Sequence, residues 1–507
     1  MSSPRPTGSG EATLFLMADI RGVLRPCGCT VELQKGGFDR LIPFLAEERR
    51  RHPGASILHA GPLFYEEAIV DAKKKAQRER QAEVAAELVA RTGFDVAGAT
   101  GTDQVGSGGR LLDLAGRAKV QVTAANLTFP AEAGKAVPPF VVKEVGGLRV
   151  GIFALASPEA AEVEGGALAI AEPEQAAVVT VAKLRREADV VVLLSDLGLR
   201  ETKRLVRKVA GIDFVVAGGM GEHPSVADEA EAVGDARVLQ FHREGRYLGR
   251  LTIRMVGGSR EWVDASAVGE GELLALDDRI KKLEAALAEL HKTHEPDDLA
   301  VRSADHHLAA VRTERDRLAQ KRATPPTDRS SFSFTQTPLN WDLPQDGDVL
   351  GLMKAFDEEL ARINVANAGT LPEPKPGESV YVGTEACFEC HAETKPFWGA
   401  TPHSKAWETL VDAGKTFDAE CVSCHVTGYG KAGGSLVGHT AGREDVQCEA
   451  CHGPGSKHSE DGDLATIIGK PTVEVCTGCH NTHHSPKFVF ASFREQLLVP
   501  GHGKPVK

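Results

Sequence analysis

The sequence predicts a multidomain protein of class α/β plus α, and three observations support this prediction. Apolar runs of strand length alternate with amphipathic segments between residues 13 and 257. A leucine-rich pattern with alternating spacings of four and three follows, and the C-terminal quarter is rich in Cys and His. A chain of 507 residues is also longer than one hydrophobic core usually organises.

The composition excludes two classes of function. A net charge of −12 argues against a nucleic-acid partner, because phosphate binding normally needs a basic face. No apolar run approaches the length that spans a membrane, so no transmembrane segment is expected. Residues 1–12 are predicted to be a flexible N-terminus, with neither the basic nor the apolar region of an export signal.

The segment 13–257 is predicted to be one α/β domain. Its expected strands are Leu14–Ala18, Ser56–Ala60, Val120–Ala124, Leu148–Ala156, Asp189–Leu194 and Phe214–Ala217. An amphipathic, charged segment, Glu66–Arg91, lies between two of them. Gly146-Gly147 separates Phe140–Val145 from the fourth strand and signals a hairpin, so mixed rather than purely parallel sheets are expected.

Several short motifs in this domain resemble the 5′-nucleotidase branch of the calcineurin-like metallophosphoesterases. They are Ala18-Asp-Ile-Arg-Gly22, Lys35-Gly-Gly-Phe-Asp-Arg40, His59-Ala-Gly-Pro-Leu-Phe64, Gly93-Phe-Asp95, Thr100-Gly-Thr-Asp103, Ala125-Asn126, Leu194-Ser-Asp-Leu-Gly198 and Ala217-Gly-Gly219. The resemblance implies an α/β sandwich over most of residues 13–257, and a catalytic centre in which two divalent metals clamp a phosphate.

The metal ligands of that family are mostly replaced here. Asp19 is kept, but the other ligand positions read Arg21, Pro62, Gly101-Thr102, Asp196 and Gly219-Met220-Gly221-Glu222. A bridging carboxylate cannot become proline without losing a two-metal site. The domain is therefore predicted to be a catalytically vestigial phosphoesterase. The alternative is a rearranged metal site built from Asp19, Asp103, Asp196, Glu222 or His223.

Cys27 and Cys29 lie in the loop after the first strand, where an open α/β sheet binds its ligands. One interpretation is a local structural disulfide or two inert thiols. Another is a redox pair, because a disulfide across one intervening residue closes a small, strained and easily reduced ring. Soft-metal binding is the third interpretation.

A helical hairpin is predicted over about 272–322. Its apolar positions are Leu276, Ile280, Leu283, Leu287 and Leu290 in one helix and Leu308, Val311 and Leu318 in the other. The break at His294-Glu-Pro-Asp297 makes this an antiparallel coiled coil, which packs on its own chain or mediates self-association. His306 and His307 are expected to be solvated.

Residues 323–378 are predicted to be a linker with a short strand, Ser331–Thr335, and a helix, Val349–Val365. The proline-rich segment 371–377 then stiffens the entry into a C-terminal domain over 379–507.

The pentapeptide Cys-x-x-Cys-His, which is the attachment signal of a c-type haem, occurs four times in the C-terminal domain. The cysteines are Cys387, Cys390, Cys421, Cys424, Cys448, Cys451, Cys476 and Cys479, and the histidines are His391, His425, His452 and His480. The two cysteines of each motif form thioethers, and the adjacent imidazole is the proximal iron ligand. Four c-type haems are therefore expected. Structural zinc is the alternative, but zinc sites need no histidine directly after every cysteine pair.

The same region resembles the tetrahaem cytochromes of the cytochrome c-554 family. The matching text is Tyr381-Val-Gly through Cys387, Trp398, His403-Ser-Lys-Ala406, Cys424-His-Val-Thr-Gly-Tyr429, Val446-Gln-Cys-Glu-Ala-Cys-His-Gly-Pro-Gly455, His458 and His502-Gly503. The resemblance implies a mainly helical domain with stacked haems and distal ligands at His403, His458 and His502. It does not assign these three histidines to particular irons.

In that family the second attachment site has an open iron, and Cys421-Val-Ser-Cys-His-Val-Thr-Gly-Tyr429 matches it closely. The candidates that would close it here are His439, His483 and His484. None of the chain's methionines follows residue 353, so low-potential bis-histidine ligation is expected at the other haems.

Three functions are compatible with these features. The first is an exported or periplasmic electron carrier that exchanges electrons with redox partner proteins. The second is an oxidoreductase that converts a small nitrogen or sulfur compound at an open haem, and the third, more distant, is a metal-dependent nucleotidase. Electron transfer is favoured because it needs only the haems and histidines that the sequence contains.

Overall fold

The computed structural model describes residues 8–26, 34–70, 74–104, 109–129, 137–160, 162–163, 166–167, 169–219, 229–266, 270–293, 295–296, 298–320, 327–438, 441–480, 485, 488–500 and 502–504. The chain forms two compact units. The first comprises Met1–Val70 and Arg80–Leu350, and the second comprises Asp71–Glu79 and Gly351–Lys507. Two helices, α2 (Lys75–Thr92) and α8 (Gly347–Asn367), contribute residues to both units.

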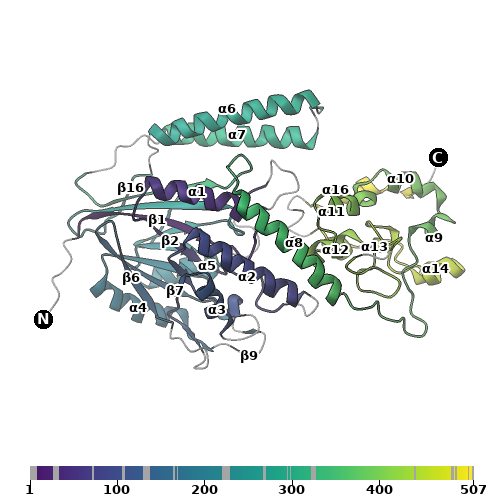
Figure 1. Cartoon of the computed structure of the whole chain (residues 1–507), viewed down its shortest axis with the longest axis horizontal. Helices are drawn as coiled ribbons and strands as arrows, with labels where there is room; N and C mark the ends of the chain where they lie inside the picture. The colour runs from purple at the N-terminus through teal and green to yellow at the C-terminus, as the bar shows by residue number, and fades with distance from the viewer. Residues whose placement is uncertain are drawn as a thin grey trace. The chain divides into compact units, whose positions relative to one another are not determined.

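The first unit contains a seven-stranded sheet with the order β16-β17-β15-β1-β2-β3-β4 (Figure 1). Its strands are β1 (Gly10–Ala18), β2 (Ser56–Ala60), β3 (Val96–Gly98), β4 (Gln121–Thr123), β15 (Tyr247–Met255), β16 (Val263–Asp264) and β17 (Ser331–Pro338). The four strands from β1 to β4 are parallel, whereas β15 is antiparallel to both β1 and β17. The strand expected at Ser331–Thr335 is therefore present and belongs to this sheet.

The second sheet of this unit has six strands in the order β13-β14-β12-β11-β7-β6. They are β6 (Phe140–Val145), β7 (Leu148–Leu155), β11 (Val190–Ser195), β12 (Phe214–Ala217), β13 (Glu231–Val233) and β14 (Ala236–Gln240). The predicted hairpin is confirmed, because β6 and β7 pair antiparallel up to Val145 and Leu148. Gly146 has φ +56°, and a Cβ there would lie 1.7 Å from the carbonyl oxygen of Glu11, so only glycine fits.

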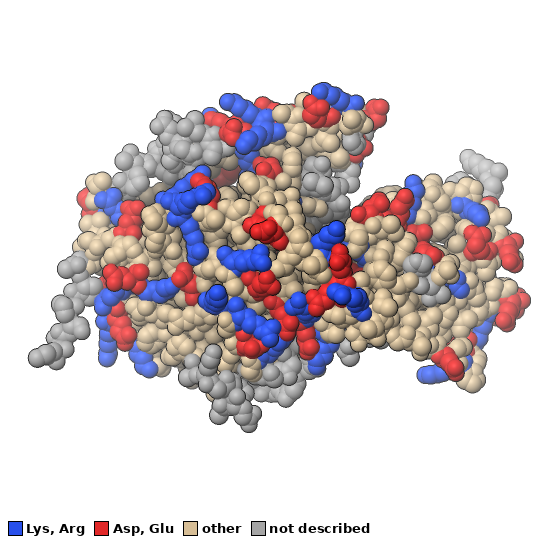
Figure 2. Space-filling model, viewed as in Figure 1, with Lys and Arg blue, Asp and Glu red and all other residues tan. Residues whose placement is uncertain are grey.

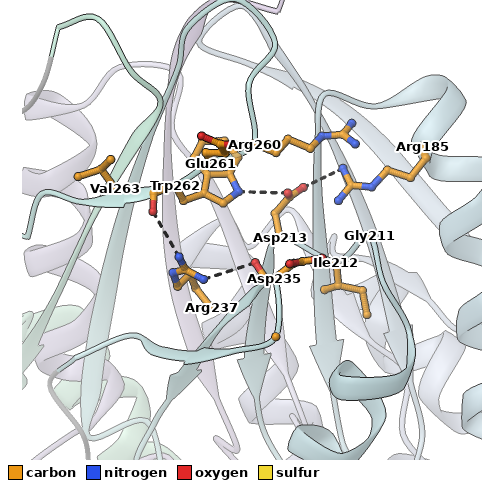
Figure 3. A pocket seen from close by; sticks show the side chains of 11 residues that line it. Arg185, Gly211, Ile212, Asp213, Asp235, Arg237, Arg260, Glu261, Trp262 and Val263 are labelled. Atoms are coloured by element: carbon orange, nitrogen blue, oxygen red, sulfur yellow. Dashed lines mark hydrogen bonds and ion pairs between the residues drawn. The ribbon is translucent and has the colours of Figure 1, made fainter.

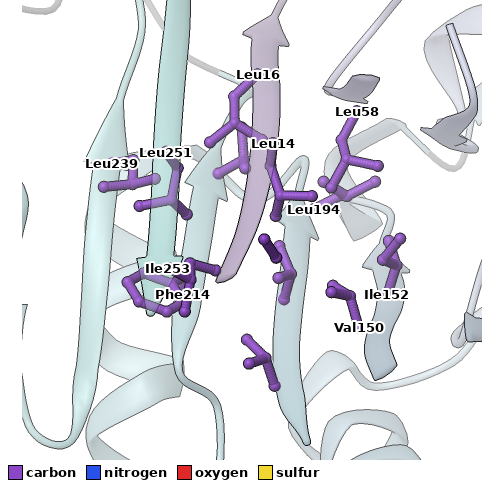
Figure 4. Packing of buried hydrophobic residues seen from close by; sticks show 14 of the residues in the cluster. Leu14, Leu16, Leu58, Val150, Ile152, Leu194, Phe214, Leu239, Leu251 and Ile253 are labelled. Carbon is purple, nitrogen blue, oxygen red and sulfur yellow. The ribbon is translucent and has the colours of Figure 1, made fainter. Parts of the chain in front are cut away.

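The two sheets pack face to face and bury a shared core (Figure 4). Leu14, Leu16 and Leu58 come from the first sheet, and Ile152 and Leu194 from the second, each at most 1% exposed. Five helices complete the α/β sandwich: α1 (Phe38–Arg51), α2, α3 (Arg110–Arg117), α4 (Pro173–Glu187) and α5 (Gly198–Lys208). The helices α4 and α5 cover the outer face of the second sheet through a separate apolar cluster. Two further sheets have two short antiparallel strands each: β5 (Leu127–Thr128) pairs with β10 (Ala169–Ile170), and β8 (Glu162–Val163) pairs with β9 (Gly166–Ala167).

Two long helices, α6 (Glu270–Thr293) and α7 (Leu299–Gln320), lie side by side in the first unit (Figure 1). Their contact is apolar and includes Leu283, Leu287 and Leu308. The expectation that His306 and His307 are both solvated needs correction. His306 is exposed, but His307 is partly buried and its Nε2 lies 3.2 Å from Nδ2 of Asn340. Burial lowers the pKa of His307 to about 4.

The second unit is mainly helical. After α8 come α9 (Thr384–Phe388), α10 (Lys395–Gly399), α11 (Ala406–Asp412), α12 (Ala419–His425), α13 (Cys448–His452), α14 (Ser456–Asp461), α15 (Val473–Thr477), α16 (Phe490–Leu497) and the strands β18 (Val499–Pro500) and β19 (Gly503–Lys504). Its hydrophobic cluster is small, with Leu410, Val422 and Val426 buried at the contact of α11 and α12. The short helices bury little apolar surface among themselves.

The surface drawn in Figure 2 mixes the two signs of charge, with Lys and Arg side chains interspersed among Asp and Glu. Many of these charges are paired locally, as between Arg91 and Glu87 at 2.9 Å. Within the described ranges, no helix combines the length and the apolar character needed to cross a lipid bilayer.

Candidate functional site

Each Cys-x-x-Cys-His segment lies on or just after a short helix of the second unit. The helices are α9, α12, α13 and α15. In the first and last segments the histidine N–H donates to the carbonyl of the first cysteine, His391 to Cys387 at 2.9 Å and His480 to Cys476 at 2.8 Å. One helical turn thus brings both cysteines and the histidine of a segment close together, as attachment to one porphyrin requires.

Three histidine pairs lie at the separation that an iron ion would span. The ring centroids are 6.4 Å apart for His391 and His458, 6.1 Å for His452 and His502, and 6.0 Å for His403 and His480. Two metal–nitrogen bonds of about 2 Å each, plus about 1 Å from each nitrogen to its ring centre, add up to roughly 6 Å. Each pair joins one expected proximal ligand to one expected distal ligand, so these residues fit bis-histidine haem.

Most of these imidazoles are oriented through Nδ1. The Nδ1 acceptors are the carbonyl oxygens of Ala406 for His425 (2.5 Å), Ile468 for His452 (2.6 Å), Asp463 for His458 (3.1 Å) and Leu497 for His502 (2.6 Å). Nδ1 of His480 lies 2.9 Å from Oγ of Ser485. A donating Nδ1–H fixes the tautomer and leaves the Nε2 lone pair for a metal. Burial also lowers the pKa of His403, His452 and His480, which favours the neutral form that can act as a ligand.

His425, in the second segment, differs from the other three proximal histidines. Its Nδ1 contacts the Ala406 carbonyl, and Thr409 Oγ1 lies 3.3 Å away. Among the residues that the structure describes, no second imidazole stacks opposite its ring at an iron-spanning distance. The expected rivals His439, His483 and His484 lie outside the described residues, as do Cys27 and Cys29.

Glu449 ties the first and third attachment segments together. This carboxylate is 1% exposed and accepts from the N–H groups of Val382 (2.9 Å), Gly383 (2.7 Å) and Gly455 (2.7 Å). Its neighbour Gln447 accepts from the N–H of Thr384, the first residue of α9. Both residues lie in the motif that resembles the cytochrome c-554 family, but the sequence alone predicts no role for them.

The attachment cysteines of different segments also lie close together. The sulfur of Cys387 interacts with that of Cys448, and the sulfur of Cys424 with that of Cys479. The first segment is therefore adjacent to the third, and the second is adjacent to the fourth. Such proximity would place the porphyrins bound there in close neighbour pairs.

The first unit has a separate polar centre at the carboxyl ends of β1, β11 and β12. Oδ1 of Asp19 lies 3.5 Å from Nη2 of Arg21 and accepts from the N–H of Gly219 at 3.0 Å. Asp196 is buried beside it, and burial, followed by the charge of Asp19, raises the pKa of Asp196 well above its ordinary value. The guanidinium of Arg21 is thus a positive charge beside this pair of carboxylates.

Asp103, another carboxylate of that region, is hydrogen-bonded to the backbone. Asp103 is fully buried and accepts from the N–H groups of Leu63, Phe64 and Tyr65 at 2.8–3.0 Å. In the part of the chain that the structure describes, no group of three or more His, Cys, Asp or Glu side chains is arranged to hold a metal ion. Glu222 and His223, named in the alternative metal site, lie outside the described residues.

A cavity of about 520 Å³ lies next to the start of β12, at the strand end opposite to the polar centre of Asp19 and Asp196 (Figure 3). Several of its charged side chains are paired within the wall. Asp213 contacts Nη1 of Arg185 at 2.9 Å and accepts from Nε1 of Trp262 at 3.1 Å, while Arg237 donates to the Trp262 carbonyl. These contacts connect β12 to the segment before β16, which is a structural role.

The attachment segments and the histidine geometry indicate a c-type cytochrome domain in the second unit. Residues 386–453 match the family described as cytochrome c554 and c-prime. Cytochrome c-554 of Nitrosomonas europaea is 30% identical over 144 residues, which cover 22% of this chain and 61% of that protein. The chain thus spans less than two thirds of the length of this curated relative. The resemblance predicted for the C-terminal region is confirmed.

The solved structures similar to this chain include nucleotidases. A 5′-nucleotidase precursor from Thermus thermophilus is 22% identical, with a TM-score of 0.41, over 48% of this chain and 53% of the other. The NAD nucleotidase of Haemophilus influenzae is 14% identical, with a TM-score of 0.49, over 74% of this chain and 64% of the other. These are proteins of the class that the N-terminal motifs resemble.

Proposed function

We propose that the protein is an exported multihaem c-type cytochrome that carries electrons through four covalently bound haems. The observation that carries this proposal is the set of three histidine pairs at iron-spanning separations, each linking a Cys-x-x-Cys-His histidine to a distant one. When bound, each haem supplies a one-electron couple at its iron. The protein would exchange electrons with redox partner proteins outside the cytoplasm.

The residues of the second unit divide into three roles in this proposal. The eight cysteines hold the porphyrins covalently, and His391, His425, His452 and His480 are the proximal ligands. His458 serves the first haem, His502 the third and His403 the fourth, following the observed pairs. The backbone carbonyls that accept from Nδ1, together with the Ser485 hydroxyl that contacts His480, keep the rings oriented toward the metal.

The second haem is proposed to have an open or weakly held sixth position. The observation in its favour is that His425 has no opposing imidazole among the described residues. An open position would allow a second function, the binding or conversion of a small nitrogen or sulfur compound at this iron. The N-terminal domain is proposed to be catalytically vestigial, with Arg21 in place of a metal-binding side chain beside Asp19.

Intact mass and EPR of the oxidised protein, matured in a periplasm that attaches haem, test the proposal. We expect four haem additions, three low-spin haems and one high-spin component. His458→Ala should convert one more haem to high spin, whereas the matched variant His439→Ala should change nothing. A mass of apoprotein plus zinc would refute the haem proposal, and a wholly low-spin spectrum that gains a high-spin signal in His439→Ala would refute the open site.

A further inference from the structure

The helix that carries the second attachment site, α12, is held at its N-terminus by residues from two distant parts of the sequence. Asp418 is the N-cap, and its side chain accepts from the N–H of Glu420 at 3.1 Å. The contacts that hold Asp418 and its neighbours come from residues 74–78 and from the part of α8 after Leu350, which belong to the same compact unit as the attachment segments.

A buried pair of amides forms the centre of this arrangement. Gln77 and Asn364 are 2% and 5% exposed. Nε2 of Gln77 donates to Asp418 Oδ1 at 2.7 Å, and its Oε1 accepts from the N–H of Ala419, the first residue of α12, at 3.3 Å. Nδ2 of Asn364 donates both to Oε1 of Gln77 at 2.8 Å and to the Phe417 carbonyl at 2.7 Å.

Both side-chain polar atoms of Gln77, Nε2 and Oε1, therefore have hydrogen-bond partners. Gln77 is buried, so water could not replace these partners. Buried amides without partners are costly, so the complete network specifies one position for the start of α12. Cys421 and Cys424 follow within six residues of the cap, and His425 ends the same helix. A shift of the cap would move the attachment cysteines and the proximal histidine together.

Two cations accompany the amide pair. Lys74 Nζ and Arg78 Nη2 lie 3.1 and 3.2 Å from the same oxygen of Glu420, the residue just before Cys421. All three side chains are less than one third exposed, at 32%, 19% and 28%. Glu420 is thus paired with two cations, while Lys415 pairs with Asp418 and Asp357 in the same unit. These charges are partly desolvated, so they act on a neighbouring redox centre with less screening than fully exposed charges.

We propose that the first turn of α2 and the C-terminal half of α8 are parts of the second haem site, with Gln77 and Asn364 as positioning residues and Lys74 and Arg78 as charges that raise the potential of that haem. This inference rests on the proposed attachment of a haem to Cys421 and Cys424. Positive charge near a haem stabilises the added electron, so Lys74 and Arg78 favour the reduced state and the carboxylate of Glu420 opposes it. The second haem site thus includes residues almost 350 positions before its attachment signal.

The charge part is tested with the full-length, haem-loaded protein by potentiometric titration. The potential that is missing from a Cys421→Ser/Cys424→Ser double variant, which cannot attach this haem, identifies the second haem. Lys74→Gln should lower that potential and Glu420→Gln should raise it, each by about a tenfold change in the equilibrium constant for reduction, which is about 59 mV for one electron. Arg80→Gln, on the same helix but in the first unit, should leave it unchanged. Equal potentials in wild type and Lys74→Gln, or a shift of the opposite sign, would overturn the charge role.

The positioning part is tested with Gln77→Met, which keeps the length of the side chain but removes its hydrogen bonds. We expect four haems by mass, a changed EPR signal of the second haem and unchanged signals of the other three. Gln104→Met is the matched control, since Gln104 is a fully buried glutamine of the first unit. If Gln77→Met leaves the second haem's signal unchanged, the positioning role is wrong.

The two proposals can fail separately. If EPR of the wild-type protein contains no high-spin component, the open sixth position is refuted, but the potential of the second haem still reports on Lys74 and Glu420. If intact mass lacks a haem on Cys421 and Cys424, both proposals are refuted. If Gln77→Met does not fold, the partly exposed Lys74→Gln variant decides the inference alone.

Discussion

At the scale of single residues, the buried imidazole of His59 makes the first unit sensitive to acid. His59 lies in β2, accepts from the N–H of Ile20 at 3.3 Å and stacks on Phe94. Burial lowers its pKa to about 3, whereas an unfolded histidine titrates near 6.5. Since the unfolded chain binds the proton more readily, the stability due to neutral His59 is complete above about pH 6.5 and is lost as the pH falls toward 3.

We therefore expect the free energy of unfolding of the first unit to fall by up to about 1.4 kcal/mol per pH unit in this window from His59 alone. Hydrogen exchange of β1 and β2 amides at pH 7 and pH 5 measures this loss. A His59→Leu variant should show a weaker pH dependence, and His291→Asn, at an exposed position, should behave like the wild type. Identical pH dependence in His59→Leu would contradict the explanation.

The carboxylate of Glu449 is the second residue with a specific prediction. It accepts hydrogen bonds from three backbone N–H groups in two loops. In Glu449→Gln the amide NH₂ would face at least one of these donors, so a loss of about 2–3 kcal/mol in the stability of the second unit is expected. Thermal unfolding followed in the haem absorption band measures it, with the exposed Glu474→Gln as control. Equal midpoints for the two variants would count against the role of Glu449.

The third residue-scale prediction concerns Arg21. Its guanidinium lies beside Asp19, and Asp103 is committed to the backbone of the loop after β2. A two-metal hydrolysis is therefore not expected, and nucleotide substrates with added manganese should yield no turnover above background. Metal-dependent turnover that disappears in Asp19→Ala would show that a rearranged site is active.

At the scale of elements, the sequence predicts strands that are buried on both faces better than strands that bury one face. The expected strand Ser56–Ala60 has the bounds of β2, and Phe214–Ala217 has those of β12; both are short, mainly apolar segments in which every residue is buried. The strand β15 was not predicted. It buries alternate residues such as Leu251 and Ile253, and this weaker pattern does not stand out in a search for apolar runs. The partner of β17 could not be predicted either, since pairing depends on residues far away in the sequence.

The contact between α6 and α7 is the element whose stability is simplest to test. Leu283 is 4% exposed and packs in the cluster that joins the two helices. Leu283→Ala should destabilise this contact by about 2–4 kcal/mol through the lost apolar burial and the remaining cavity. Hydrogen exchange of both helices measures the effect. Leu350→Ala, at a position 42% exposed, should leave the exchange of α6 and α7 unchanged, and an equal response to both variants would argue against the observed packing.

The sequence also predicts some residues of the candidate site but not how they are paired. The proximal histidines follow directly from the Cys-x-x-Cys-His spacing, and the family resemblance supplied His403, His458 and His502. Their proposed assignment to particular irons rests on the folded chain, because His403 precedes His480, its neighbour in the structure, by 77 positions while His458 follows His391 by 67. The backbone carbonyls that orient the rings have no sequence signal at all.

At the scale of the whole molecule, the two units have different sources of stability. The first has an extensive core between its sheets, whereas the cluster of the second contains only three fully buried side chains among the described residues. Porphyrins would supply the missing apolar surface. We expect that chains made without haem attachment keep the first unit folded but expose the second to protease. Limited proteolysis with mass spectrometry measures this, and a protease-resistant segment 379–507 in the haem-free chain would contradict it.

The discontinuity of the second unit also has a consequence for the order of its assembly. Gln77 is made early in synthesis, and its partner Asp418 follows 341 positions later, so the network at the cap of α12 closes a very long loop. Contacts across such separations form late, because the entropy of loop closure is lost before the contact compensates for it. The first and third attachment segments are held together by residues from Ser379 onward. We therefore expect the hydrogen-bond network at the cap of α12 to close last, and the second haem to be the last to reach its final environment.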